Sequence, residues 1–116
     1  MAPFRRESGA GDGVKRWSHL HILLPQLGMY AKSPTLLGYD LNTLYAMPAP
    51  KPVLVVSPQL DWEAPVAKVT RCVESARKLY AQFGAEDRLA HLTPEDYNHF
   101  DANAQARVID WLLNQR

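Results

Sequence analysis

The sequence has little cysteine, no long apolar run and almost no net charge. A single cysteine, Cys72, stands among 116 residues, which excludes an internal disulfide framework and leaves the cellular compartment undetermined. No apolar stretch approaches the ~20 residues that span a bilayer, and residues 1–7 carry charge without the apolar core of a signal peptide. The 13 basic and 12 acidic residues nearly balance, so charge favours neither a nucleic-acid partner nor a membrane partner.

The length and composition predict one domain. Apolar residues make up 47% of the chain, which is enough for a hydrophobic core, and 116 residues are too few for two domains. Residues 1–14 are rich in glycine, serine and charge and are expected to form a loop or a poorly ordered N-terminal segment. The predicted domain therefore occupies residues 15–116.

A short apolar run is the clearest strand. Val53–Val56 lies between a proline and a Ser-Pro pair, the pattern of a strand buried on both faces in a parallel sheet. Residues 88–92 alternate weakly and predict a second strand. Between them, apolar residues recur at helical spacing from Val66 to Phe83, and Gly84 is a typical helix-ending glycine.

Three further helices are predicted around these elements. Leucines at helical spacing over residues 20–27 predict a helix that Pro25 interrupts and Gly28 ends. Asp40 and Asp101 are typical N-cap residues, and they predict the starts of a short helix and of a C-terminal helix.

The predicted order of elements belongs to the α/β class, with about two parallel strands and flanking helices. A strand–helix–strand unit of this length joins two parallel strands through a crossover. Two parallel strands do not form a stable sheet alone, because parallel sheets need cover on both faces and further neighbours. We therefore expect a missing partner, either further chain or another subunit, and an open sheet edge.

Each predicted strand is followed by a titratable side chain. Asp61 follows the first strand, and His99 follows the second. Parallel strands bring their carboxyl ends to one edge of the sheet, where α/β proteins place their functional side chains. A carboxylate that orients a histidine is part of a hydrolase triad, and the order acid then histidine is that of α/β-hydrolases. Glu63 competes with Asp61 as the acid. Alternatively, Asp61 caps the turn before the next helix, and His99 is a loop residue beside Phe100.

Four blocks stand in order from Lys15 to the end of the chain. They are RWSHLHILLPQLG, then YDLNTLYAMPAPKPVLVVSPQLDWEA, then LTPEDYNHF, and last an amphipathic helix. This order resembles the C-terminal portion of α/β-hydrolases of the esterase and acetyl xylan esterase-like kind. The resemblance implies a partial three-layer α/β/α fold to which this chain supplies the seventh and eighth strands. It also implies that Asp61 and His99 are the acid and the histidine of the triad.

The sequence departs from that family at the nucleophile. It has no G-x-S-x-G elbow: Ser57 ends a strand, but Val55 and Gln59 stand where the elbow needs glycines. The resemblance thus implies the C-terminal segment of a serine hydrolase acting on carboxylic esters, without the serine and inactive alone. Its partners would be an ester substrate in the intact parent, and the missing N-terminal part of the fold or a second copy. The alternative is a small non-catalytic α/β module that docks a protein partner through its open sheet edge.

The remaining histidine, cysteine and tryptophan candidates do not predict a further catalytic site, and no cofactor or metal is expected. His19 and His21 would share a face only on a strand, so this H-x-H pair is expected at the surface or beside a cleft. His91 is expected to be structural. Cys72 has no base nearby in sequence and is expected at the core or its boundary. Trp62 is expected to pack or to form one wall of a substrate pocket.

Overall fold

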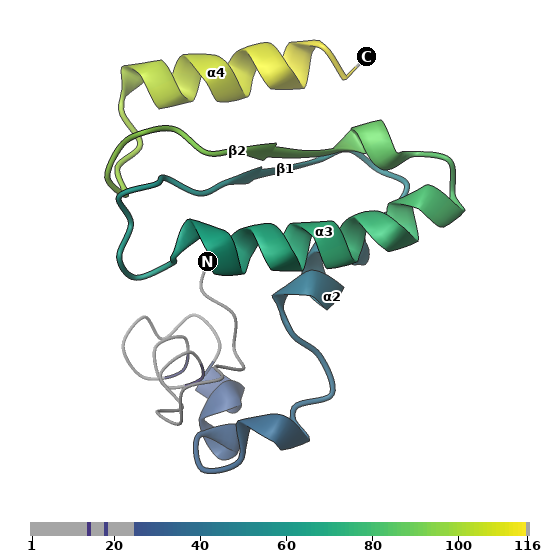
Figure 1. Ribbon diagram of the computed structural model, residues 1–116, viewed down its shortest axis with the longest axis vertical. Coiled ribbons are helices and arrows are strands. Elements are labelled where there is room, and N and C mark those ends of the chain that lie inside the picture. The colour runs from purple at the N-terminus through teal and green to yellow at the C-terminus, as the bar shows by residue number, and fades with distance from the viewer. Residues whose placement is uncertain (1–13, 15–17, 19–24, 116) are drawn as a thin grey trace.

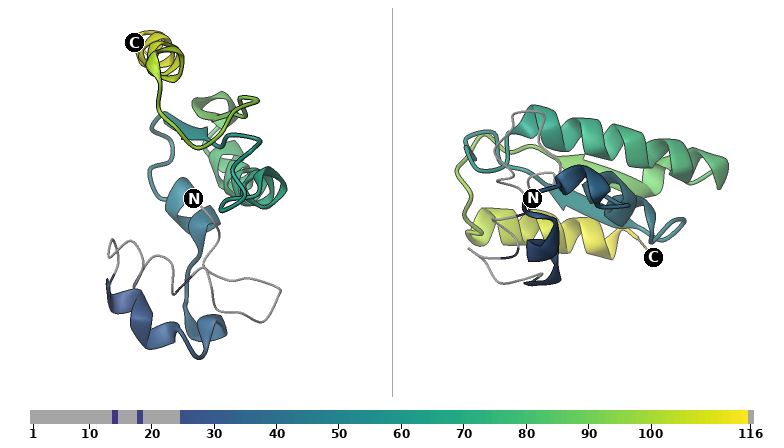
Figure 2. Two further views of the ribbon diagram at one scale, coloured as in Figure 1. Left: turned by 90° about the vertical axis from the view of Figure 1, so that its left-hand side faces the viewer. Right: turned by 90° about the horizontal axis from the view of Figure 1, so that it is seen from below.

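The computed structural model describes residue 14, residue 18 and residues 25–115 of the chain. In this part, a two-stranded sheet lies between helix α4 (Ala102–Leu113) on one side and helix α3 (Val66–Gln82) on the other (Figure 1). The two helices remain on opposite sides of the strands in the other views (Figure 2). The predicted α/β class is confirmed. No helix in the described part of the chain is long and apolar enough to cross a membrane.

The sheet consists of β1 (Val53–Val56) and β2 (Leu89–Leu92), which pair in parallel. The short 3-10 helix η4 (Glu86–Arg88) leads into β2. Both strands and their parallel pairing agree with the prediction. The expected burial of β1 on both faces is wrong, because Val55 is its only buried residue. Successive side chains of a strand point to opposite faces, and only the face toward α3 is tightly covered.

The main hydrophobic core lies between the sheet and α3. Val55 and Leu89 of the strands belong to one buried cluster with four residues of α3: Val69, Val73, Ala76 and Tyr80. These four follow the helical spacing that predicted the helix. The hydroxyl of Tyr80 donates a hydrogen bond to the carbonyl oxygen of Lys51 at 2.9 Å, which joins the end of α3 to the segment before β1.

The helix α3 ends where the sequence predicts. Gly84 follows it with a φ of +62°, in the left-handed region that glycine adopts without steric cost. The chain then turns into η4 and β2. The turn reverses the chain, so that β2 returns beside β1 and pairs with it in parallel.

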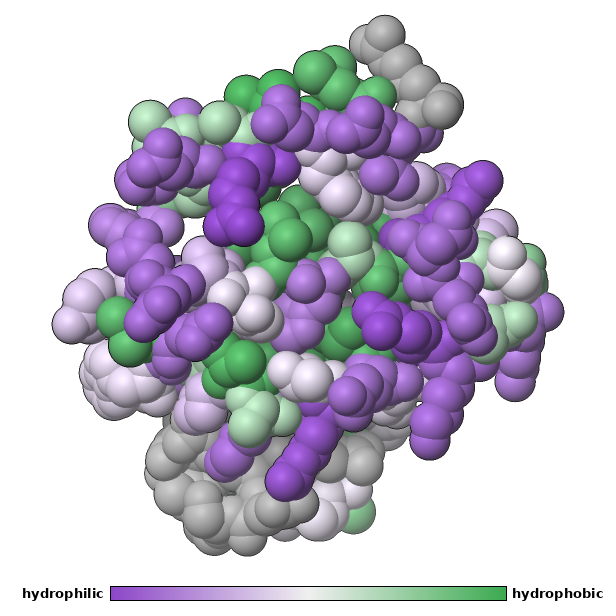
Figure 3. Space-filling view, turned by 45° about the horizontal axis from the view of Figure 1, so that its top comes forward, coloured by the Kyte–Doolittle hydropathy of each residue, from purple (hydrophilic) through white to green (hydrophobic). Residues whose placement is uncertain are grey.

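Helix α4 covers the other face of the sheet only loosely. None of its residues is buried, and Ile109, Leu112 and Leu113 are each more than half exposed. On the facing side of the sheet, Val56 and Leu92 are only half-buried. Figure 3 shows apolar side chains at the surface between the helix along the top and the rest of the molecule. This face fits the expectation that two parallel strands need further cover.

A second, smaller core lies beneath α2 (Leu41–Ala46), the short helix that packs against α3. Its buried residues are Val14, Leu27, Leu37 and Leu41. The predicted N-cap of α2 is confirmed, since a carboxylate oxygen of Asp40 accepts the main-chain N–H of Leu41 at 2.7 Å.

The segment before α2 differs from the prediction. The 3-10 helix η2 (Pro25–Tyr30) runs through Gly28, so this glycine does not end a helix, and a second 3-10 helix, η3, spans Pro34–Leu36. Val14, in the range predicted as a loop, is helical and fully buried, because its apolar side chain packs in the smaller core. Residues 1–13 and most of the helix predicted over residues 20–27 lie outside the described residues.

Candidate functional site

The loops that follow β1 and β2 run side by side at the carboxyl end of the sheet. Main-chain hydrogen bonds extend the pairing beyond the strands: the N–H of Gln59 donates to the carbonyl of Pro94 at 2.8 Å, and that of Leu60 donates to the carbonyl of Asp96 at 3.0 Å. The loops that carry Asp61 and His99 are therefore held together, as the sequence predicts for parallel strands.

Asp61 holds the turn that leads into α3. One of its carboxylate oxygens, Oδ1, accepts the main-chain N–H of Glu63 at 2.9 Å and that of Ala64 at 3.2 Å. The side chain is largely buried, with 8% of the residue exposed. The turn-capping role considered for Asp61 is thus real. In the described part of the chain, its second oxygen, Oδ2, has no hydrogen bond.

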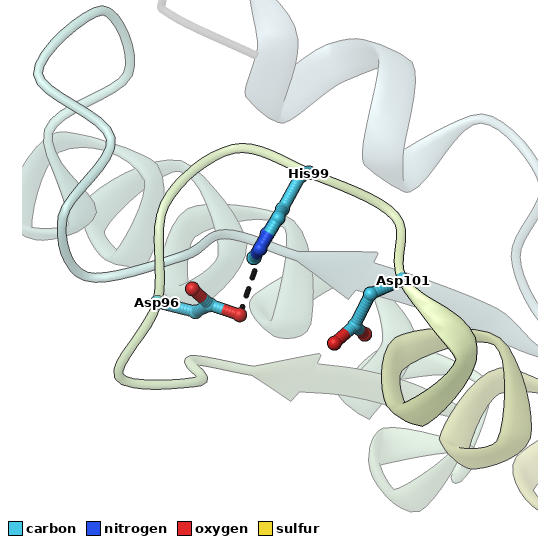
Figure 4. Close-up of side chains that lie close together, drawn as sticks. All are labelled: Asp96, His99 and Asp101. Atoms are coloured by element: carbon cyan, nitrogen blue, oxygen red, sulfur yellow. Dashed lines mark ion pairs between the residues drawn. The ribbon is translucent and has the colours of Figure 1, made fainter.

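His99 lies at the surface and faces a different acid. Its Nδ1 is 3.4 Å from Oδ2 of Asp96, and the two side chains are 55% and 40% exposed. Figure 4 shows Asp96, His99 and Asp101 converging from the loop after β2 and the start of α4. The structure brings the loops of Asp61 and His99 together, but within the described residues no ion pair joins these two side chains. Their catalytic assignment remains a prediction.

Asp96 and Asp101 were not predicted to lie beside His99. Each of these acids has one oxygen held by the main chain: Asp96 accepts the N–H of Tyr97 at 2.8 Å, and Asp101 accepts that of Ala104 at 2.8 Å. The second bond confirms Asp101 as the N-cap of α4. The signal that was available is the D-x-x-H-x-D spacing, which places three potential ligands within one loop.

A groove of about 410 Å³ opens between this loop, the ends of the strands and α4. Its apolar lining includes Val56, Leu92, Pro94 and Val108. Its polar lining includes Asn103, Arg107 and the three residues Asp96, His99 and Asp101. A groove with an apolar floor and a few convergent polar groups is the common form of a small-molecule site.

A serine–histidine pair lies on the opposite face of the sheet, beneath α3. The hydroxyl of Ser57 and Nε2 of His91 are hydrogen-bonded at 2.5 Å. Burial, and after it the positive charge of Arg77, lower the pKa of His91 below its usual 6.5. Ser57 is only 1% exposed, so a substrate cannot reach its hydroxyl. The pair joins β1 to β2, and His91 is structural, as expected.

The other predicted candidates have no part in the groove. Cys72 is half-buried, as expected; burial first, and then the carboxylate of Asp40, raise the pKa of its thiol, which disfavours a nucleophilic thiolate. Trp62 is 79% exposed and is not among the residues that line the groove, so the expected packing role is wrong. His19 and His21 lie outside the described residues.

Comparisons with known proteins returned no match: no family model, no curated protein and no solved structure is significantly similar to this chain.

Proposed function

We propose that this chain is the C-terminal part of a serine hydrolase of the α/β type that acts on carboxylic esters. Asp61 and His99 are its acid and histidine in a Ser-Asp-His triad, and the chain is inactive alone because it has no nucleophile elbow. One observation carries the proposal. The hydrogen bond from Leu60 to Asp96 holds the two loops together at the carboxyl ends of parallel strands, where α/β enzymes place reacting groups.

The hydrogen bonds of Asp61 support its role as the acid. A triad acid must be fixed in position and must offer one oxygen to the Nδ1–H of the histidine. Oδ1 of Asp61 is fixed by two main-chain N–H groups, and the described residues make no hydrogen bond to Oδ2. The turn-capping role and the catalytic role use different oxygens, and the two roles are compatible.

The exposed position of His99 supports its role as the base. To reach Asp61, its Nδ1 must leave Asp96, and both partners of that pair are well exposed. Exposed ion pairs contribute ~0–1 kcal/mol, so opening this one costs little. The imidazole would then donate Nδ1–H to Asp61 and take the proton of a serine through Nε2.

The loosely covered sheet supports the view that the fold continues. The α4 face leaves Leu112 and Leu113 more than half exposed, and β1 has one strand neighbour among the described residues. A parallel sheet in α/β proteins is covered on both faces. An upstream portion with further strands would supply both this cover and the serine.

An ester assay tests the chain alone. The purified chain is expected to hydrolyse p-nitrophenyl acetate no faster than its His99→Ala variant, and a fluorophosphonate probe should leave it unlabelled. Hydrolysis that disappears in His99→Ala would contradict the claim that the chain is inactive.

Reconstitution tests the assigned residues. The chain is mixed with the serine-bearing upstream part of an acetyl xylan esterase-like enzyme that has been shortened before its own seventh strand. Ester hydrolysis should appear, fall steeply with His99→Ala and Asp61→Asn, and persist with the matched control Asp96→Asn. Loss of activity in Asp96→Asn but not in Asp61→Asn would move the acid to Asp96.

The alternative function is a non-catalytic module that docks a protein partner through its sheet edge. The observation that favours it is the two-stranded sheet, in which β1 and β2 each keep an edge without a strand neighbour among the described residues. Under this alternative, a partner would protect the edge amides of β1 from hydrogen exchange, and His99→Ala would change no measurable activity.

A further inference from the structure

Three potential metal ligands converge at the start of α4. The ligand atoms of Asp96, His99 and Asp101 all lie within 4.8 Å of one another, and the three side chains line the groove (Figure 4). One imidazole nitrogen and two carboxylate oxygens, with a position left for water, form a donor set that suits zinc. We infer that this chain binds one Zn²⁺ ion through Asp96, His99 and Asp101.

The distances in the cluster are close to those of a zinc site. Zinc bonds of 2.0–2.1 Å place neighbouring ligand atoms of a tetrahedron about 3.4 Å apart. The Nδ1 of His99 and Oδ2 of Asp96 are already 3.4 Å apart. The ligand atom of Asp101 lies within 4.8 Å of the other two and has to move closer to them to complete the site. The cluster therefore needs little rearrangement to accept the ion.

The main chain orients both carboxylates for this role. One oxygen of Asp96 is bound by the N–H of Tyr97, and Oδ1 of Asp101 is bound by the N–H of Ala104. In each case the other oxygen is the one available to a metal. Outer hydrogen bonds of this kind restrict how a ligand can turn and lower the cost of assembling a site.

The local charge favours a cation in spite of the helix terminus. The N-terminal end of a helix carries about half a positive charge, and Arg107 also lines the groove. Against these stand the carboxylates of Asp96 and Asp101, and Glu95 adds a third in the same lining. Three negative charges outweigh one and a half positive charges, so the site attracts a divalent cation.

Zinc binding does not depend on the proposed hydrolase role, but the two uses of His99 exclude each other. An Nδ1 that holds zinc has no hydrogen to donate to Asp61. In an assembled triad, zinc is therefore expected to inhibit through the histidine. The zinc measurements below need no ester and no added subunit, so their failure would leave the hydrolase proposal untouched.

Calorimetric titration of the full chain with ZnCl₂ tests the inference, with Co²⁺ absorption as a report on coordination. We expect saturable binding of one ion per chain and a visible Co²⁺ band. His99→Gln, Asp96→Asn and Asp101→Asn should each weaken binding at least about tenfold. Asparagine keeps an oxygen that accepts the main-chain N–H, so the loop and the start of α4 should persist, which far-ultraviolet circular dichroism checks.

The matched controls are histidines outside the cluster. His91→Gln and the double variant His19→Gln/His21→Gln should bind zinc as the unchanged chain does. No saturable binding up to about 1 mM zinc would overturn the inference. Binding that survives all three cluster variants, or that is lost in the His19→Gln/His21→Gln variant, would overturn it as well. Should one cluster variant fail to fold, the other two decide the outcome.

Discussion

The hydroxyl of Ser57 and Nε2 of His91 are joined by a hydrogen bond of 2.5 Å between the two strands, beneath α3. The pKa of His91 is lowered by burial and by Arg77, so the folded chain takes up this proton less readily than the unfolded chain does. The contribution of neutral His91 to stability is therefore complete above pH 6.5, the ordinary value. It is lost as the pH falls from there through the lowered pKa of the folded state.

Urea unfolding between pH 8 and pH 5 measures this contribution. The unchanged chain should lose more stability over that interval than the His91→Gln variant, in which position 91 no longer titrates. Comparing the two curves removes the effects of the other histidines. If the two proteins lose the same stability over this pH interval, His91 binds its proton equally well in the folded and the unfolded state.

Two tyrosines provide a matched test of buried hydroxyl groups. The hydroxyl of Tyr80 is bonded to Lys51, whereas the buried hydroxyl of Tyr45 has no hydrogen-bond partner among the described residues. Burial is the main cause that raises the pKa of Tyr45 to about 12. Tyr80→Phe should destabilise the chain by about 1 kcal/mol, and Tyr45→Phe should stabilise it by up to about 1 kcal/mol. Equal destabilisation by both changes in urea unfolding would contradict this assignment.

Substitutions at two glycines distinguish backbone strain from steric crowding by an added Cβ. At both Gly84 and Gly38, an added Cβ meets no described atom within 4 Å, but only Gly84 has a positive φ. Gly84→Ala should therefore destabilise the chain by ~1–2 kcal/mol through backbone strain alone. Gly38→Ala should change stability by less than about 1 kcal/mol in either direction. Measuring the free energy of unfolding of the two variants tests this difference. Equal losses of stability in the two variants would argue against backbone strain at Gly84.

Two variants separate the hydrogen bonds that Asp61 accepts from the charge of its carboxylate. Asp61→Ala removes the acceptor of the N–H groups of Glu63 and Ala64, and should cost about 1–3 kcal/mol because Ala64 is buried. Asp61→Asn keeps an oxygen at that position and should cost much less. Thermal unfolding of both variants checks this difference. If the two cost the same, the carboxylate charge, and not the hydrogen bonds, holds the turn.

Local signals were sufficient for the two strands and for helices α2, α3 and α4, but not for the 3-10 helices before α2. Apolar spacing predicted α3 and the run at β1, and single residues with known preferences predicted the helix ends at Asp40, Gly84 and Asp101. The burial of β1 was not predictable from its own residues. Burial depends on how closely α4 approaches the sheet, and the sequence of the strand carries no information on that distance.

The sequence predicted which loops meet at the candidate site, but not which of their side chains are in contact. The rule that parallel strands share a carboxyl edge placed Asp61 and His99 at the same end of the sheet. The contact of His99 with Asp96 depends on the turn angles of their loop, which residue spacing does not fix. The bond between Ser57 and His91 depends on the strand register, which pairs Val55 with His91, and residue spacing does not fix that register.

The parallel register has a consequence for the order of folding. Every residue of β1 pairs with a residue that lies beyond the whole of α3, from Val53 with Leu89 to Val56 with Leu92. The hydrogen bonds of α3 close over a few residues, whereas the strand pairs must close a loop that contains the entire helix, at a larger cost in chain entropy. We therefore expect α3 to form first and to act as the template against which the two strands meet.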